Sequence, residues 1–264
     1  MKVCIDWRKS FKYLDEVDEY NIDFKVDKID KLLKFLDRYA TGDKRVNIST
    51  PREGNNLSIL SSMKKKYDYN IAVKMNYLKG EENSLSELKE NGVPFFYSQY
   101  ISNWESLNKY LEDGVSDVII SGELGFALPK VAAVVGGRAQ TRVYVNISQY
   151  TYGDSIKGFF IRPEAIDLYS DYVDIFEIYT SEGRLNPLYE IFFKDKHWDG
   201  RLQEIVQYLD NPVNNYYILG NEFDHRRLQC GKKCIKGEKC SLCERIVELA
   251  NTLEQSKDYD VFRR

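Results

Sequence analysis

Histidine is scarce in this chain of 264 residues, which contains two, His197 and His225. The sequence also lacks a Gly-x-Ser-x-Gly turn, a His-Glu-x-x-His pair and a phosphate-binding P-loop. A serine or cysteine nucleophile with a histidine base would have to use His197 or His225, and both follow the last strand that we predict. The sequence therefore predicts none of these common hydrolase sites.

Long apolar runs and an excess of one charge are missing as well. No stretch of about 18 apolar residues occurs, and the N-terminus lacks the apolar core of a secretory signal, so we expect neither a membrane span nor export. The 38 Lys and Arg residues and 41 Asp and Glu residues are mixed along the chain and give a formal net charge of -3. This balance gives no support for nucleic-acid binding, and we expect a cytoplasmic protein.

Short runs of β-branched and aromatic residues alternate with longer amphipathic stretches, a pattern that is typical of βα units and a parallel sheet. From the second to the sixth run, the starts are roughly 23 to 25 residues apart, which fits a strand, a loop and about three helical turns. We count eight such runs: 3–6, 46–49, 70–75, 94–98, 117–121, 142–147, 158–161 and 174–179.

Eight βα-type runs predict an α/β fold, namely a closed (β/α)8 TIM-type barrel with a C-terminal cysteine-rich helical extension. An open, doubly wound sheet uses the same units, but no dinucleotide-type glycine fingerprint follows the first run. We expect residues 1–182 to form the barrel, 183–229 to form a helical extension packed on it, and 230–264 to form a four-cysteine segment and a final helix.

The intervening stretches carry helix signals. Apolar residues from Val26 to Leu36 recur at i, i+3 and i+4 spacing, and Asn103 is a predicted N-cap. Gly92, Gly114 and the pair at 136–137 stand where helices should end, and we expect them to supply left-handed C-cap residues.

Four of the five cysteines lie within 14 residues in a C-x3-C-x5-C-x2-C pattern. Two close thiolate pairs joined by a glycine-containing loop can hold one zinc ion or one iron-sulfur cluster, and spacing alone slightly favours zinc. The predicted ligands are Cys230, Cys234, Cys240 and Cys243. Cys4, at the start of the first run, is predicted to be a small buried side chain and not a nucleophile.

Three segments in the C-terminal 60% of the chain resemble the U-32 peptidase (collagenase-like protease) family, in particular its small uncharacterised barrel members. The order and spacing of these segments carry the resemblance more than any single motif does. They are Gly114 to Ile120 with Gly122-Glu123-Leu124-Gly125, Arg142 to Asn146 with Phe160 to Glu164, and Asp174 to Ile178 with Gly183-Arg184 and Asp199-Gly200.

The resemblance implies an enzyme whose family carries the name peptidase. Relatives in that family carry iron-sulfur clusters used in oxygen-independent hydroxylation, which implies a [4Fe-4S] cluster at the cysteines, with Zn²⁺ as the alternative. We therefore expect redox or hydroxylation chemistry on an unidentified small or macromolecular substrate. The alternatives are proteolysis, or a non-catalytic zinc-stapled binding or assembly subunit with a paralogous partner.

Active sites of such barrels lie at the carboxyl ends of the strands, so polar residues at those positions are candidates. Arg162 and Arg184 could clamp an anionic group, and Glu123 and Glu164 could transfer protons, although each could equally form a structural ion pair at the rim. The complete set of candidates is Asp6, Asn76, Gln99, Glu123, Asn146, Arg162, Glu164, Glu177 and Arg184.

Overall fold

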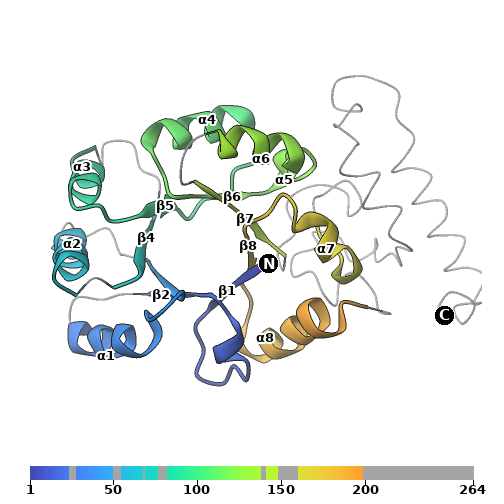
Figure 1. Cartoon of the computed structure of the whole chain (residues 1–264), viewed down its shortest axis with the longest axis horizontal. Coiled ribbons are helices and arrows are strands. Elements are labelled where there is room, and N and C mark those ends of the chain that lie inside the picture. The colour runs from blue at the N-terminus through green and yellow to red at the C-terminus, as the bar shows by residue number, and fades with distance from the viewer. Residues whose placement is uncertain are drawn as a thin grey trace, which may run out of the picture.

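The computed structural model describes residues 1–23, 28–49, 55–67, 69–76, 82–137, 141–147 and 160–198. Eight parallel strands close into a barrel in the order β1 to β8, and helices surround it (Figure 1). The strands are β1 Lys2–Asp6, β2 Glu19–Asp23, β3 Arg45–Ser49, β4 Ile71–Met75, β5 Phe95–Tyr97, β6 Asp117–Ile120, β7 Arg142–Asn146 and β8 Ile175–Ile178. The predicted (β/α)8 class is confirmed.

The helices follow their strands around the outside of the barrel. They are α1 Ile29–Tyr39, α2 Asn55–Tyr67, α3 Glu82–Glu90, α4 Trp104–Asp113, α5 Gly122–Gly125, α6 Leu128–Gly136, α7 Ile166–Tyr169 and α8 Glu182–Tyr189. Short 3-10 turns are η1 Leu14–Glu16 and η3 Pro163–Ala165, and the π-helix η4 Glu190–Asp195 continues α8. No helix within the described ranges is long and apolar enough to cross a membrane.

The strands turn apolar side chains toward the helices and mainly polar side chains into the barrel lumen, with Phe96 of β5 as an apolar exception that stacks on Tyr144. In β2, for example, Tyr20 and Ile22 alternate with Glu19 and Asn21, and the latter two bond to groups of other strands across the lumen. The register pairs polar side chains of neighbouring strands, such as Ser49 with Lys74. The barrel therefore has its apolar core between sheet and helices, and a polar interior.

One junction of the ring has little strand pairing. Strands β5 and β6 share a single registered pair, Phe96 with Asp117, whereas the other neighbouring strands share three to five. An isolated bridge between Ile101 and Ile120 adds to this junction.

The count of eight strands was right, but one assignment was wrong. The predicted run 158–161 is not a strand at Phe160 and Ile161, which are buried next to η3, and its first two residues lie outside the described ones. The missing strand is β2, whose inward Glu19 and Asn21 hide the strand pattern because they face a polar lumen.

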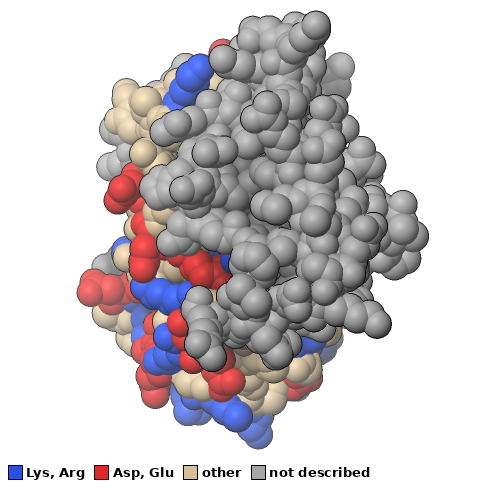
Figure 2. Space-filling model, turned by 90° about the vertical axis from the view of Figure 1, so that its right-hand side faces the viewer, with Lys and Arg blue, Asp and Glu red and all other residues tan. Residues whose placement is uncertain are grey.

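On one side of the molecule, the surface of the described residues carries both positive and negative side chains (Figure 2).

Most helix signals are confirmed. The Asn103 side chain accepts a hydrogen bond from the Ser106 N–H at 2.9 Å, and Gly92 and Gly114 have φ of 64° and 75°. Gly137 differs from the prediction, because its φ is −75° and the C-cap of α6 is right-handed.

Candidate active site at the barrel mouth

A cavity of about 690 Å³ opens at the carboxyl ends of the strands, where barrel enzymes bind their substrates. This volume lies in the usual range for small-molecule sites. The described residues that line it come from β1 to β4, from α1 and the residue before it, and from the segments after β1, β5 and β8: Asp6, Trp7, Arg8, Asn21, Ile22, Asp23, Lys28, Lys31, Leu32, Phe35, Ser49, Lys74, Ser98, Tyr100 and Tyr179.

Lys74, which lines this cavity, forms an ion pair across the lumen. Lys74 Nζ of β4 lies 2.9 Å from Glu177 Oε1 of β8, and both side chains are largely buried. Burial lowers the pKa of Lys74, but the charge and hydrogen bond of Glu177, together with the charges of Cys4 and Asp6, outweigh burial and raise the pKa above its ordinary value. Lys74 is therefore a fixed ammonium group in the lining of the cavity.

Two asparagines hold Glu177 in place. Asn21 Nδ2 donates to its Oε1 at 2.7 Å, and Asn146 Nδ2 donates to its Oε2 at 3.2 Å. Asn146 Nδ2 also lies 3.0 Å from the hydroxyl oxygen of Tyr100, to which it donates. Since that oxygen acts as acceptor, the Tyr100 hydroxyl keeps its own proton for a ligand in the cavity.

Asp6, the last residue of β1, has the most useful titration behaviour of the described mouth residues. Burial, and next the negative charge of Glu177, raise the pKa of Asp6 from 3.8 to about 6. Arg8 Nη2 lies 3.7 Å from Asp6 Oδ2 and, with Lys74, limits the rise. A carboxyl group with this pKa can both accept and return a proton near neutral pH.

A second charge network closes the opposite end of the lumen. Asp117 of β6 accepts hydrogen bonds from Arg45 of β3 and from Arg142 Nε of β7, the latter at 2.7 Å. Arg142 also pairs with Glu19 of β2, which accepts a hydrogen bond from the Tyr144 hydroxyl. The four charged residues of this network are the first residues of their strands. That end of such barrels contributes to stability, whereas the carboxyl ends carry the active site.

Two predicted catalytic residues, Arg162 and Glu164, pair with each other near η4. Arg162 Nη2 lies 3.1 Å from Glu164 Oε2, and Glu164 Oε1 accepts the Trp198 N–H at 2.8 Å. His197 Nδ1 is 3.3 Å from the same Oε1. Neither Arg162 nor Glu164 is among the described residues that line the cavity. This arrangement favours the structural ion pair that the sequence left open, and a role in catalysis stays a prediction.

Of the other predicted catalytic residues and metal ligands, one does not line the cavity, and the side chains of the rest are outside what the structure describes. Arg184 lies in the first turn of α8, where its N–H donates to the Ser181 carbonyl, and it also does not line the cavity. Glu123 belongs to α5, but its side chain is outside what the structure describes. The four ligands Cys230, Cys234, Cys240 and Cys243, and with them the predicted segments beyond residue 198, lie outside the described residues.

Asp6, Asn146 and Glu177 were predicted at the mouth. In the structure Asp6 lines the cavity, and Asn146 and Glu177 bond to each other and to its lining residues. Three residues that the sequence reasoning missed are Asn21, Lys74 and Tyr100. Lys74 had a signal, because it is a single charge inside the apolar run Ile71 to Met75. Asn21 had none, since its whole strand was missed.

Cys4 confirms its prediction. It is fully buried in the lumen, and burial, followed by the charges of Glu19 and Glu177, raises the pKa of its thiol well above the ordinary value. A thiol that stays protonated is a poor nucleophile.

Comparisons with known proteins give a partial match. No family model matches the chain. The uncharacterized protease MJ1657 of Methanocaldococcus jannaschii is 35% identical over 103 residues, a stretch that covers 36% of this chain and 29% of that protein. Over about a third of its length, this chain is therefore similar to a protein that is named as a protease.

Proposed function

We propose that the chain is a U-32-like barrel enzyme that hydrolyses peptide bonds at the barrel mouth, with Asp6 as the group that moves the proton. The observation that carries the proposal is the Asp6 carboxyl, with a pKa of about 6, in a cavity that is also lined by Lys74, the ion-pair partner of Glu177. The name of the similar archaeal protein supports hydrolysis of peptides as the reaction.

Each group has a part in this reaction. Asp6 takes a proton from a water molecule, whose oxygen attacks the carbonyl carbon of the substrate. The negative charge that develops on the carbonyl oxygen is stabilised by the Lys74 ammonium and the Tyr100 hydroxyl. The C–N bond then breaks, Asp6 returns its proton to the leaving nitrogen, and a carboxylic acid and an amine are formed from one peptide bond and one water.

A carboxylate mechanism fits the described residues better than a nucleophilic one. Cys4 lies buried below the mouth with a raised pKa, and His197 is paired with Glu164 away from the lining of the cavity. The described lining therefore offers carboxylates, ammonium groups and hydroxyls, but no thiol and no serine paired with histidine.

The pH dependence tests this proposal. We expect kcat/KM for peptide hydrolysis to rise with pH through about 6, as Asp6 loses its proton. Replacing Glu177 by glutamine removes a neighbouring negative charge, so the acid limb should move to lower pH. The measurement is a set of pH-rate profiles with peptide mixtures, read by mass spectrometry. An acid limb that stays in place in the Glu177→Gln variant, or no hydrolysis at any pH, would contradict the proposal.

A second candidate function is iron-sulfur-dependent redox or hydroxylation chemistry, which the four-cysteine motif favours. A [4Fe-4S] cluster held by Cys230, Cys234, Cys240 and Cys243 would supply electron transfer. Anaerobically purified protein is then expected to be brown and to contain iron and acid-labile sulfide, and Cys240→Ser should abolish both. The Cys4→Ser variant is the matched control and should keep them.

The metal content separates the alternatives. A colourless protein with one zinc ion that hydrolyses no peptide would favour the zinc-stapled binding or assembly subunit. Unchanged metal content in the Cys240→Ser variant would show that the ligand assignment is wrong.

A further inference from the structure

Helix α1 turns a two-part face toward the mouth cavity. Lys28, which precedes its first turn, Lys31, Leu32 and Phe35 all line the cavity. Their spacing of i, i+3, i+4 and i+7 places them along one side of the helix. Along this side of the helix, the two ammonium groups lie nearer its N-terminus and the two apolar side chains nearer its C-terminus.

The two lysines differ from the other cations of the lining. Lys74 is paired with Glu177, and Arg8 lies 3.7 Å from Asp6. Lys28 and Lys31 make no ion pair with any residue of the described ranges. The described lining carries four cationic side chains, Arg8, Lys28, Lys31 and Lys74, against two carboxylates, Asp6 and Asp23. The positive charge along α1 therefore suits an anionic group of a ligand.

The apolar part of this face continues into neighbouring side chains. Phe35 packs edge-to-face on Trp7, with ring centroids 5.2 Å apart, and Ile22 of β2 also lines the cavity. Leu32 and these three side chains form a rigid apolar wall beside the lysines. A ligand that carries an anionic group next to an apolar side chain would match both parts.

We infer that this face binds the C-terminal end of a peptide, with Lys28 and Lys31 on the free carboxylate and the last apolar side chain against Leu32, Phe35 and Trp7. The inference rests on the proposed function and names its substrate class: short peptides with a free, apolar C-terminal residue. Peptides with a blocked C-terminus are then poor substrates.

The test compares N-acetyl-leucyl-phenylalanine with its C-terminal amide, with binding to the full chain measured by calorimetry. The free acid is expected to bind roughly tenfold more tightly, since one charge-assisted contact is worth about that factor. Lys31→Ala should weaken this preference, because Lys28 still faces the carboxylate, and the double change at Lys28 and Lys31 should remove it.

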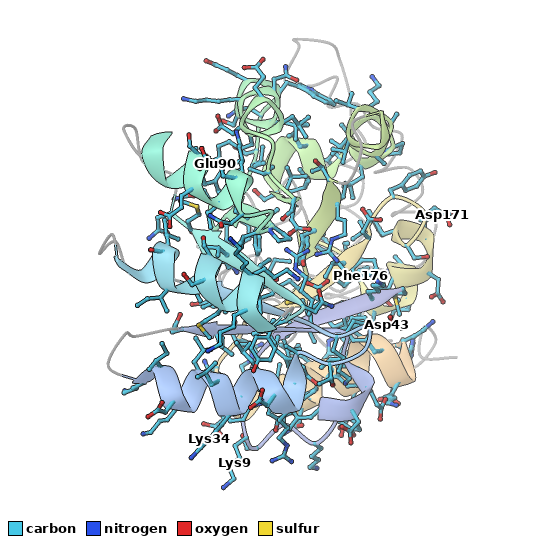
Figure 3. The ribbon with its side chains drawn as sticks, turned by 60° about the vertical axis from the view of Figure 1, so that its left-hand side comes forward. Lys9, Lys34, Asp43, Glu90, Asp171 and Phe176 are labelled. Carbon is cyan, nitrogen blue, oxygen red and sulfur yellow. The ribbon has the colours of Figure 1, made fainter. Side chains whose placement is uncertain are left out.

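Lys34→Ala is the control, because Lys34 lies on the same helix but points outward (Figure 3) and does not line the cavity. This variant should keep the preference. Equal binding of acid and amide, or no binding of either, would overturn the inference. Hydrolysis is followed separately in the same mixtures, so that an enzyme that cleaves both peptides equally contradicts the substrate class alone, whereas selective binding without cleavage contradicts the proposed reaction alone.

Discussion

Asp6→Asn should lower kcat/KM for peptide hydrolysis by about 10²- to 10⁴-fold, the usual contribution of a positioned acid–base group. Asparagine keeps the size and the hydrogen-bonding shape of the side chain but cannot take a proton from water. Asp171→Asn, a change of the same kind at an exposed outward residue (Figure 3), should leave kcat/KM unchanged. Activity within tenfold of the wild type in the Asp6→Asn protein would contradict the assigned role.

The same Asp6→Asn change should make the protein more stable at pH 7. Because the folded state raises the pKa of Asp6 from 3.8 to about 6, the free energy of unfolding falls as the pH rises through that window and stays lower above it. The variant lacks this loss, which amounts to at most roughly 3 kcal/mol. Urea unfolding should show the gain at pH 7 and its disappearance near pH 4. A destabilised variant at pH 7 would mean that the Asp6 carboxylate is favourable where it lies.

The second large effect concerns the closed end of the lumen. Asp117→Asn should reduce the free energy of unfolding by about 3–5 kcal/mol, because it leaves Arg45 buried without its carboxylate partner. Arg142 Nε, which lies 2.7 Å from Asp117 Oδ1, would also lose the negative charge of its partner. Chemical unfolding of the variant measures the loss, with Asp171→Asn as a control that should change stability by no more than about 0.5 kcal/mol.

The kcat/KM of the Asp117→Asn protein tests whether this end of the lumen serves stability and not catalysis. If Asp117 is structural, the folded fraction of the Asp117→Asn protein should retain its kcat/KM at low temperature. A loss of less than about 1 kcal/mol would instead show that water or Glu19 compensates the arginines.

The ring of strands was predictable because most strands are apolar on the side that packs against helices. β3, β4 and β6 to β8 show up as β-branched or aromatic runs, and Gly92 and Gly114 mark the ends of α3 and α4. β2 was not predictable in this way, since its inward side chains are Glu19 and Asn21 and only Tyr20 and Ile22 pack outward. A polar lumen removes the signal that strand prediction uses.

The site was predictable only in position. The rule that barrel sites lie at carboxyl ends of strands selects Asp6, Asn146 and Glu177. Asp6 lines the cavity, and Asn146 and Glu177 bond to its lining residues Tyr100 and Lys74. The rule also selects Arg162 and Arg184, which do not line the cavity, because position along the chain does not say whether a side chain turns into the lumen or along the outside. The pairing of Lys74 with Glu177 joins residues 103 positions apart, and no local pattern encodes it.

The ion pairs inside the barrel have a consequence for how the ring can open. Lys74–Glu177 joins β4 to β8, Arg45–Asp117 joins β3 to β6, and Glu19–Arg142 joins β2 to β7, so each spans the circle instead of linking adjacent strands. The thinly paired β5–β6 junction would otherwise be the place where the cylinder unrolls into a flat ribbon. With these internal braces, unrolling at that junction has to break contacts on distant strands at the same time, so partial opening is disfavoured and the barrel should come apart as one cooperative unit.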